Sequence, residues 1–201
     1  DGLCSSEGLS AWITKPSGQK EGQSLIPGEG LYYVLYFSAK EIGYYDFVVK
    51  KEAVYSIDAE GKYMAGSKKE NPEAVQGIAY TQYSRCLVRV GNTEKEIPSG
   101  THCNLCISQL AHYNYQAGNE LQVELSFKDE VLPGVEVIIA GEGPEGSFSE
   151  TKITDSQGIL NITPVSTGQH ILIARHVDED DKKEGEYDKR NYTSVFSFTV
   201  N

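Results

Sequence analysis

The chain has 201 residues and a net charge of −11, from 18 basic and 29 acidic side chains, and 39% of its residues are hydrophobic. This balance argues against nucleic-acid binding, which needs clustered lysine and arginine, and it disfavours adhesion to an anionic membrane surface. The sequence contains no run of about 18 apolar residues, so it predicts no membrane span. Thirteen tyrosines and twenty glycines favour strands and turns over helices.

Strand-like alternation dominates the first half of the chain. Residues 31–37 are apolar or aromatic on both faces, which predicts a central strand covered on both sides. Two further strands are predicted at 47–50 and 53–57, and 78–90 is the longest strand-like run, either two strands or one bent strand. The segment 94–116 is the least regular, and irregular stretches on a rigid scaffold are common places for function.

The second half shows a sharper pattern. Apolar residues at 121, 123, 125 and 127 alternate with polar ones, which predicts an antiparallel strand with one wet face. About seven short strands follow residue 118 at the spacing typical of a sandwich, and no segment has a convincing helical period. We therefore predict an all-β protein of two tandem antiparallel β-sandwich domains, 1–117 with the irregular cysteine-containing segment and 118–201.

Several motifs of the second half occur in a familiar order. Gly118-x-Glu120-Leu121, Leu132-Pro133-Gly134-Val135, Thr154-Asp155-x-x-Gly158 and Gly168-x-His170-Ile171 come one after another. The series resembles a transthyretin-like (Ig-like) sandwich of the carboxypeptidase-regulatory kind. The ending over 192–200 is similar to that of an exported family of unknown function, whose members often accompany nickel and cobalt uptake systems.

The resemblance carries expectations about the first half and the compartment. It implies a second β domain at the N-terminus, and Trp12-Ile13-Thr14-Lys15-Pro16 is similar to the family's opening. Family members carry a histidine three residues before that tryptophan, where this chain has Leu9. It also implies an extracytoplasmic protein, periplasmic, secreted or at the cell surface. The numbering begins at Asp1, and we expect that a leader or anchor has been removed before it.

Four cysteines carry the main chemical question. Cys103 and Cys106 form a C-x-x-C pair, and two such thiolates can bind one soft or borderline metal. Two disulfides among Cys4, Cys86, Cys103 and Cys106, with the pairing open, are the leading interpretation of these cysteines. The alternatives are a divalent metal site (nickel, cobalt or zinc), with His102, Cys103, Cys106 and His112 as candidate ligands, or free thiols.

Two other groups of side chains were candidates for binding. His176 precedes the acidic run at 178–181, where an imidazole beside carboxylates could bind a metal, although an exposed histidine in a solvated acidic loop is the preferred explanation. Tyr32, Tyr33, Tyr36, Tyr44 and Tyr45 could line a sugar or peptide site by stacking, or belong to the core.

The sequence has no nucleophile elbow, no metalloprotease motif and no phosphate-binding loop, so we expect that it is not an enzyme. The leading hypothesis is a non-catalytic extracytoplasmic binding or accessory protein for divalent metal-ion uptake. Its partners would be membrane transport components or other surface proteins. The alternatives are a structural or protein-interaction domain at the cell surface, and a carbohydrate-binding module.

Overall fold

The computed structural model describes residues 6–29, 32–92, 102–111, 115–143 and 146–201. Within these ranges the chain forms fifteen β-strands and no α-helix, which confirms the predicted all-β class. The strands are β1 (Leu9–Thr14), β2 (Lys20–Gln23), β3 (Ile26–Pro27), β4 (Tyr33–Val34), β5 (Gly43–Ile57), β6 (Tyr63–Ala65), β7 (Gln76–Val90), β8 (Leu105–Gln109), β9 (Leu121–Phe127), β10 (Glu130–Val131), β11 (Glu136–Gly143), β12 (Gly146–Ile153), β13 (Ile159–Ile162), β14 (Gly168–Asp178) and β15 (Lys189–Val200).

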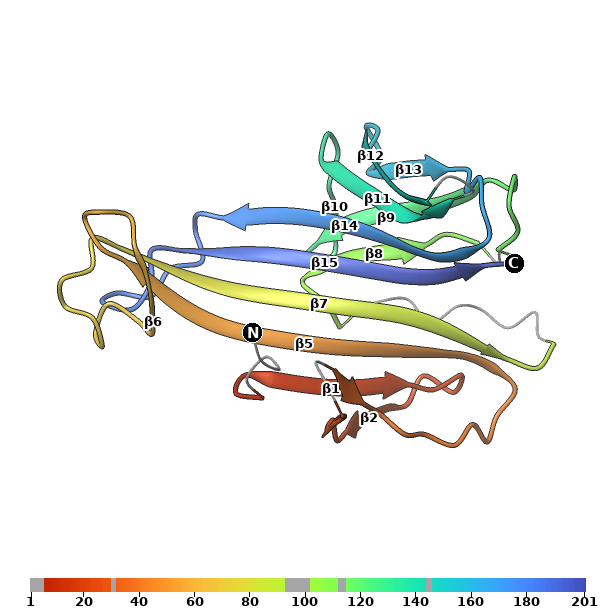
Figure 1. Ribbon diagram of the computed structural model, residues 1–201, viewed down its shortest axis with the longest axis horizontal. Helices are drawn as coiled ribbons and strands as arrows, with labels where there is room; N and C mark the ends of the chain where they lie inside the picture. Colours follow the sequence, from red (N-terminus) through yellow and green to blue (C-terminus); the bar gives the residue numbers. More distant parts are fainter. Residues whose placement is uncertain (1–5, 30–31, 93–101, 112–114, 144–145) are drawn as a thin grey trace.

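The strands form one large sheet and two small ones. The large sheet has the order β12-β11-β14-β15-β7-β5-β1-β2, with β6 paired to β5, and its long central strands run the length of the molecule (Figure 1). A four-stranded sheet has the order β10-β9-β13, with β8 paired to β9. The third sheet is the short β3–β4 pair. Neighbouring strands are antiparallel except β15 and β7, which pair in parallel from Lys189↔Ile78 to Ser197↔Cys86.

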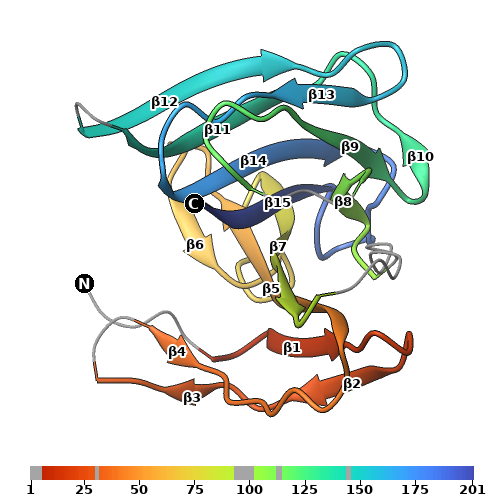
Figure 2. The same cartoon turned by 90° about the vertical axis from the view of Figure 1, so that its right-hand side faces the viewer.

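The core lies between the large sheet and the four-stranded sheet. Viewed along the strands, β8 and β9 lie over β14 and β15 (Figure 2). Leu105, Ile107 and Leu125 from the small sheet meet Leu172 and Phe196 from the large one, and all five are at most 2% exposed. The predicted alternation over 121–127 is confirmed, because the odd-numbered residues 121, 123 and 125 are the buried ones. This packing makes the fold a β-sandwich.

The large sheet crosses the predicted domain boundary at 117/118. β7 pairs with β15, and β8 pairs with β9, so strands from both predicted segments share each sheet. Neither sheet is interrupted at the boundary. The division into two domains and the transthyretin-like character of the second one stay predictions.

One strand prediction is wrong. Residues 31–37 do not form a central strand, since the described part of that segment contains only the two-residue β4. Tyr36 is 74% exposed and Tyr32 is 54% exposed. Conversely, 47–50 and 53–57 belong to the single 15-residue strand β5, and 78–90 belongs to the single strand β7. Mutual pairing over their full length keeps both strands continuous.

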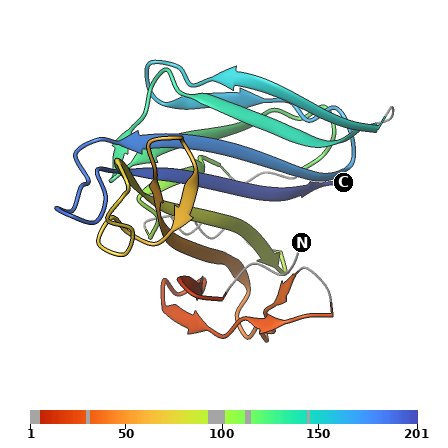
Figure 3. The same cartoon turned by 60° about the vertical axis from the view of Figure 1, so that its left-hand side comes forward.

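At one end of the molecule the β5–β7 ribbon extends beyond the small sheet and meets the loop that joins β14 to β15 (Figure 3). The backbone N–H of Lys68 donates to the carbonyl of Glu186, and that of Asp188 donates to the carbonyl of Gly77. Asp188 also accepts a hydrogen bond from the N–H of Gly77 at 2.8 Å. These contacts connect residues more than 100 positions apart in sequence.

Candidate functional site

The C-x-x-C pair stands at the beginning of β8, with Cys103 just before the strand and Cys106 within it. Cys106 is 4% exposed and Cys103 is half-buried against the core. The two thiols are hydrogen-bonded to each other, and the Ser108 hydroxyl lies 3.3 Å from the Cys106 sulfur. The structure therefore brings together two of the four predicted metal ligands.

A buried ion pair borders this thiol pair. Nε of Arg85 donates to Oδ1 of Asp46 at 2.7 Å, and each of the two side chains is 2% exposed. Nη1 of Arg85 donates to the carbonyl of Ile107 at 2.8 Å and lies 4.0 Å from the Cys106 sulfur. Burial raises the pKa of Asp46, and the Arg85 charge offsets this only in part. The guanidinium thus places one positive charge against the sulfurs inside the core.

The surroundings give the two thiols different acidities. The hydrogen bond from Cys103 lowers the pKa of Cys106 to about 6, with the Arg85 charge helping and burial opposing. The same hydrogen bond raises the pKa of Cys103, and burial adds to that shift. The arrangement therefore favours the thiolate at the more deeply buried sulfur, Cys106.

The expected disulfides are not found among the described cysteines, since none of Cys86, Cys103 and Cys106 is bonded to another cysteine. Cys86 follows Arg85 on β7, and successive side chains of a strand point to opposite faces, so Cys86 points away from the thiol pair. Cys4 and His112 lie outside the described residues. In the part of the chain that the structure describes, no three His, Cys, Asp or Glu side chains gather as a metal-binding group.

His102 lines a polar cleft of about 400 Å³ that opens beside the thiol pair. The cleft lies on the inner face of the large sheet, where the small sheet ends. Its lining comes from β1, β2, β5, β7 and β15, from the segment before β8 and from the β14–β15 loop: Ser10, Trp12, Lys20, Lys50, Glu52, Thr81, Tyr83, His102, Asn104, Asp181, Arg190 and Tyr192. Burial, and then the charge of Lys20, lower the pKa of His102, so its imidazole is neutral at pH 7.

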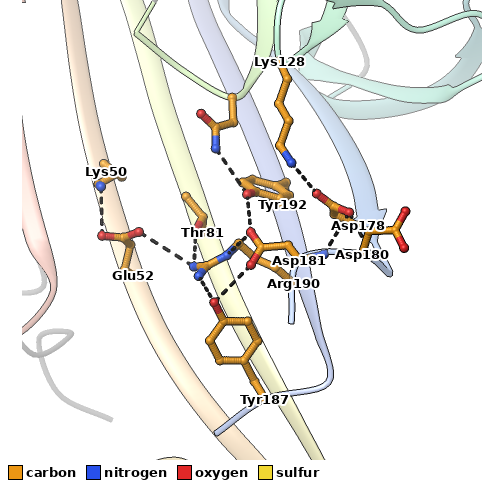
Figure 4. A network of polar contacts seen from close by, with 11 residues as sticks. Lys50, Glu52, Thr81, Lys128, Asp178, Asp180, Asp181, Tyr187, Arg190 and Tyr192 are labelled. Carbon is orange, nitrogen blue, oxygen red and sulfur yellow. Dashed lines mark hydrogen bonds and ion pairs between the residues drawn. The ribbon is translucent and has the colours of Figure 1, made fainter. Parts of the chain in front are cut away.

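Arg190 holds one side of the cleft together (Figure 4). Its guanidinium donates to Asp181 at 2.8 Å, to the Tyr187 hydroxyl at 2.8 Å and to the Thr81 hydroxyl at 3.1 Å. Asp181 also accepts hydrogen bonds from Tyr187 at 3.0 Å and from Tyr192 at 3.1 Å. These contacts fix the β14–β15 loop to the sheet and hold the Asp181 carboxylate beside a cation.

The environment of Lys20 differs from that of the other cations of the cleft. Its ammonium lies 4.1 Å from the centre of the Trp12 ring, and within the described ranges it has no ion pair with a carboxylate. Lys50, in contrast, pairs with Glu52 at 2.8 Å. Lys20 is therefore the cation of the cleft whose charge is least compensated.

The acidic run at 178–181 has structural tasks. Asp178 accepts a hydrogen bond from Lys128 at 2.7 Å and caps the following turn by accepting from the N–H groups of Asp180 and Asp181. His176 packs against Phe127 in a tilted arrangement, with ring centres 4.3 Å apart. The hypothesis of a metal held by His176 and this run is therefore not supported by any grouping in the described residues.

The tyrosines of the sequence-based cluster separate, because Tyr44 and Tyr45 are buried while Tyr32 and Tyr36 are exposed. A different trio comes together on the outer face of the β5–β7 ribbon. The Tyr55 ring centre lies 6.5 Å from that of Tyr63 and 5.7 Å from that of Tyr80, with Lys51, Ala53 and Gln82 completing a shallow groove of about 350 Å³. Sequence reasoning missed this trio, since β6 brings Tyr63 to β5 only through the turn at 58–62.

The fold and the site define an all-β sandwich protein with a polar cleft and an adjoining pair of thiols. Residues 6–178 match the family described as "Domain of unknown function (DUF4198)", and the chain belongs to that family. Among solved structures it is similar to the "tetra-tandem repeat in extending region of large adhesion protein", at 13% identity and a TM-score of 0.29. That match covers 100% of this chain, which spans 43% of the other. No curated protein matches the chain. None of the described residues forms a helix that could cross a membrane.

Proposed function

We propose that the chain is a non-catalytic extracytoplasmic binding protein that serves metal-ion uptake by holding the metal as a small anionic chelate in the cleft. The charge of the cleft carries this proposal. Three cations (Lys20, Lys50 and Arg190) and two carboxylates line it, in a chain whose net charge is −11. A free divalent cation would be repelled by this lining, whereas an anion would be attracted.

The details of the lining agree with such a ligand. Lys20 is free to pair with a ligand carboxylate, since its own partner is an aromatic face. The neutral imidazole of His102 is a nitrogen donor of the kind that nickel, cobalt and zinc accept. The uptake role itself comes from the family resemblance. Contacts with membrane transport components are part of the same proposal.

Calorimetry with three titrants tests the proposal: nickel chloride, citrate, and their preformed complex. We expect the complex to bind one per chain. Lys20→Glu should weaken binding on the order of tenfold, because reversing a charge beside the ligand costs roughly 1–2 kcal/mol at high effective dielectric. Lys62→Glu, at an exposed turn away from the cleft, is the matched control and should leave the affinity unchanged. Nickel alone binding as tightly as the complex, or equal affinity of both variants, would contradict the proposal.

The tyrosine trio favours a second candidate function, carbohydrate binding. Tyr55 is 38% exposed and Tyr63 is 57% exposed, and aromatic faces of this kind stack on sugar rings. Lys51 and Gln82 supply hydrogen-bond donors at the margin of the groove. A glycan array tests this function. Hits that disappear with Tyr63→Ala but persist with Tyr36→Ala support it, while an array without hits removes it.

A further inference from the structure

The thiol pair is a second feature with chemistry of its own, and it is separate from the ligand of the cleft. Cys103 and Cys106 are three residues apart and hydrogen-bonded to each other, and Cys106 lies between the fully buried Leu105 and Ile107 along β8. Two sulfurs this close can bind the same ion without rearrangement of the strand. We propose that Cys103 and Cys106 form a two-sulfur site for a monovalent thiophilic cation of the Cu(I) class.

The number of donors selects the ion. Zinc takes four ligands in closed sites, and nickel and cobalt likewise need further nitrogen or oxygen donors. Around the two sulfurs, the described residues supply no third His, Cys, Asp or Glu. The carboxylate of Asp46 is engaged by Arg85 at 2.7 Å and is not available as a ligand. A d10 monovalent cation is satisfied by two thiolates, so it fits a site that leaves divalent ions under-coordinated.

Burial and charge favour the same class. Cys106 is 4% exposed, so an ion that brings a tightly held hydration shell would lose it on entering the site. Binding joins the Cys106 thiolate, the Cys103 thiol and one monovalent cation in a dithiolate complex with a charge of −1 and releases the Cys103 proton, and no electron is transferred. The Arg85 guanidinium, 4.0 Å from the Cys106 sulfur, offsets that negative charge inside the core.

The site can also be reached from solvent. Cys103 is only half-buried, and its neighbours His102 and Asn104 both line the cleft. An ion can therefore arrive from the cleft side, meet Cys103 first and be passed to Cys106. This route does not require the cleft ligand itself, so the inference stands or fails independently of the proposed function.

An anaerobic competition titration tests the inference. The reduced full-length chain is titrated with Cu(I) held by bicinchoninate, and loss of the chelate's colour reports transfer. We expect one Cu(I) per chain. Cys103→Ser and Cys106→Ser should each weaken binding by more than about 100-fold. Mutation of a residue that only hydrogen-bonds to a metal ligand already lowers metal affinity about 10–100-fold, and loss of a ligand itself should cost more. Cys86→Ser is the matched control and should bind as the wild type does.

Two further measurements keep the test decisive if a variant does not fold, which circular dichroism would reveal. X-ray absorption of the wild-type copper complex should show two sulfur neighbours and no nitrogen or oxygen at bonding distance. Zinc and nickel titrated into the same protein should bind at least about 100-fold more weakly at these sulfurs. Three or more donors, equal affinity for zinc, or failure of the reduced wild type to take copper from the chelate would overturn the inference. The inference would also be overturned if the purified protein contained a disulfide between Cys103 and Cys106 and did not bind copper after reduction.

Discussion

The buried ion pair between Arg85 and Asp46 allows a quantitative test of the core. Asp46→Asn keeps the shape of the side chain but removes its charge, which leaves the buried guanidinium without its carboxylate partner. Both side chains are 2% exposed, so water cannot replace the lost partner. Breaking such a pair costs about 3–5 kcal/mol, a large part of the roughly 5–15 kcal/mol that stabilises a typical domain.

A double-mutant cycle separates the charge from the packing. With Arg85→Met in addition, no charge is stranded, and the remaining cost is the unsatisfied carbonyl of Ile107, about 1–3 kcal/mol. The double variant should therefore be more stable than Asp46→Asn alone. The chain has a single tryptophan, Trp12, which is 7% exposed, so urea unfolding can be followed by its fluorescence.

Asp129→Asn is the control for this series. Asp129 lies in an exposed turn at φ 67°, a conformation that asparagine tolerates, so the substitution should change stability by less than about 0.5 kcal/mol. The reasoning is refuted if Asp46→Asn destabilises the protein by less than about 1 kcal/mol, or if the two single effects simply add.

Three further predictions concern single positions. The hydrogen bond from Lys128 lowers the pKa of Asp178 in the folded protein. The ionised carboxylate therefore stabilises the fold above the ordinary pKa of a carboxyl group, and this stabilisation is lost as the pH falls through the pKa of Asp178 in the folded state. Asp178→Asn should cost about 0.2–1 kcal/mol of unfolding free energy at pH 7 and less at pH 2, as measured by urea unfolding. Thr154→Val should cost about 1–3 kcal/mol in the same assay, because the buried hydroxyl serves one backbone N–H and one carbonyl. Gly158→Ala should lower the melting temperature more than Gly118→Ala. Both glycines have positive φ, but a Cβ at 158 would lie 2.9 Å from a backbone oxygen whereas 118 faces open space.

Each of these has an outcome that would count against it. A pH-independent effect of Asp178→Asn would mean that its charge does not act through Lys128. A neutral Thr154→Val would show that water reaches the turn. Equal melting temperatures for the two alanine variants would show that the backbone at Gly158 relaxes at little cost.

The alternation of side chains predicted most strands because burial in a sandwich follows the period of the strand. Seven strands were expected after residue 118, and β9 to β15 are seven. The prediction failed at 31–37, where aromatic residues on both faces suggested full coverage. Tyr36 remains 74% exposed, because among the described strands only the short β3 pairs with this segment. The alternation of side chains within a segment does not show whether another sheet packs on that segment.

The same limit applies to the site. Cys103 and Cys106 are three residues apart, so their proximity could be expected from the motif alone. Arg85 and Asp46 are 39 residues apart and meet only through the register of β5 and β7. One signal was present around Asp46, a charged residue between Tyr44-Tyr45 and Phe47-Val48-Val49, since a charge within such an apolar run is buried only with a partner. The trio of Tyr55, Tyr63 and Tyr80 had no comparable local signal.

The parallel pairing of β15 with β7 has a consequence for biogenesis. β15 lies between β14 and β7, and the pairing of Lys189 with Ile78 closes a loop of more than 100 residues. Until residues 189–200 have emerged from the ribosome, the edges of β7 and β14 that pair with β15 lack their hydrogen-bonding partner. Such long-range closure is slow and leaves nascent strands open to aggregation. The polypeptide should therefore complete its native sheet late and in one cooperative step. Until that step it should stay unfolded enough to pass through a translocation pore, and it should depend on chaperones that prevent aggregation.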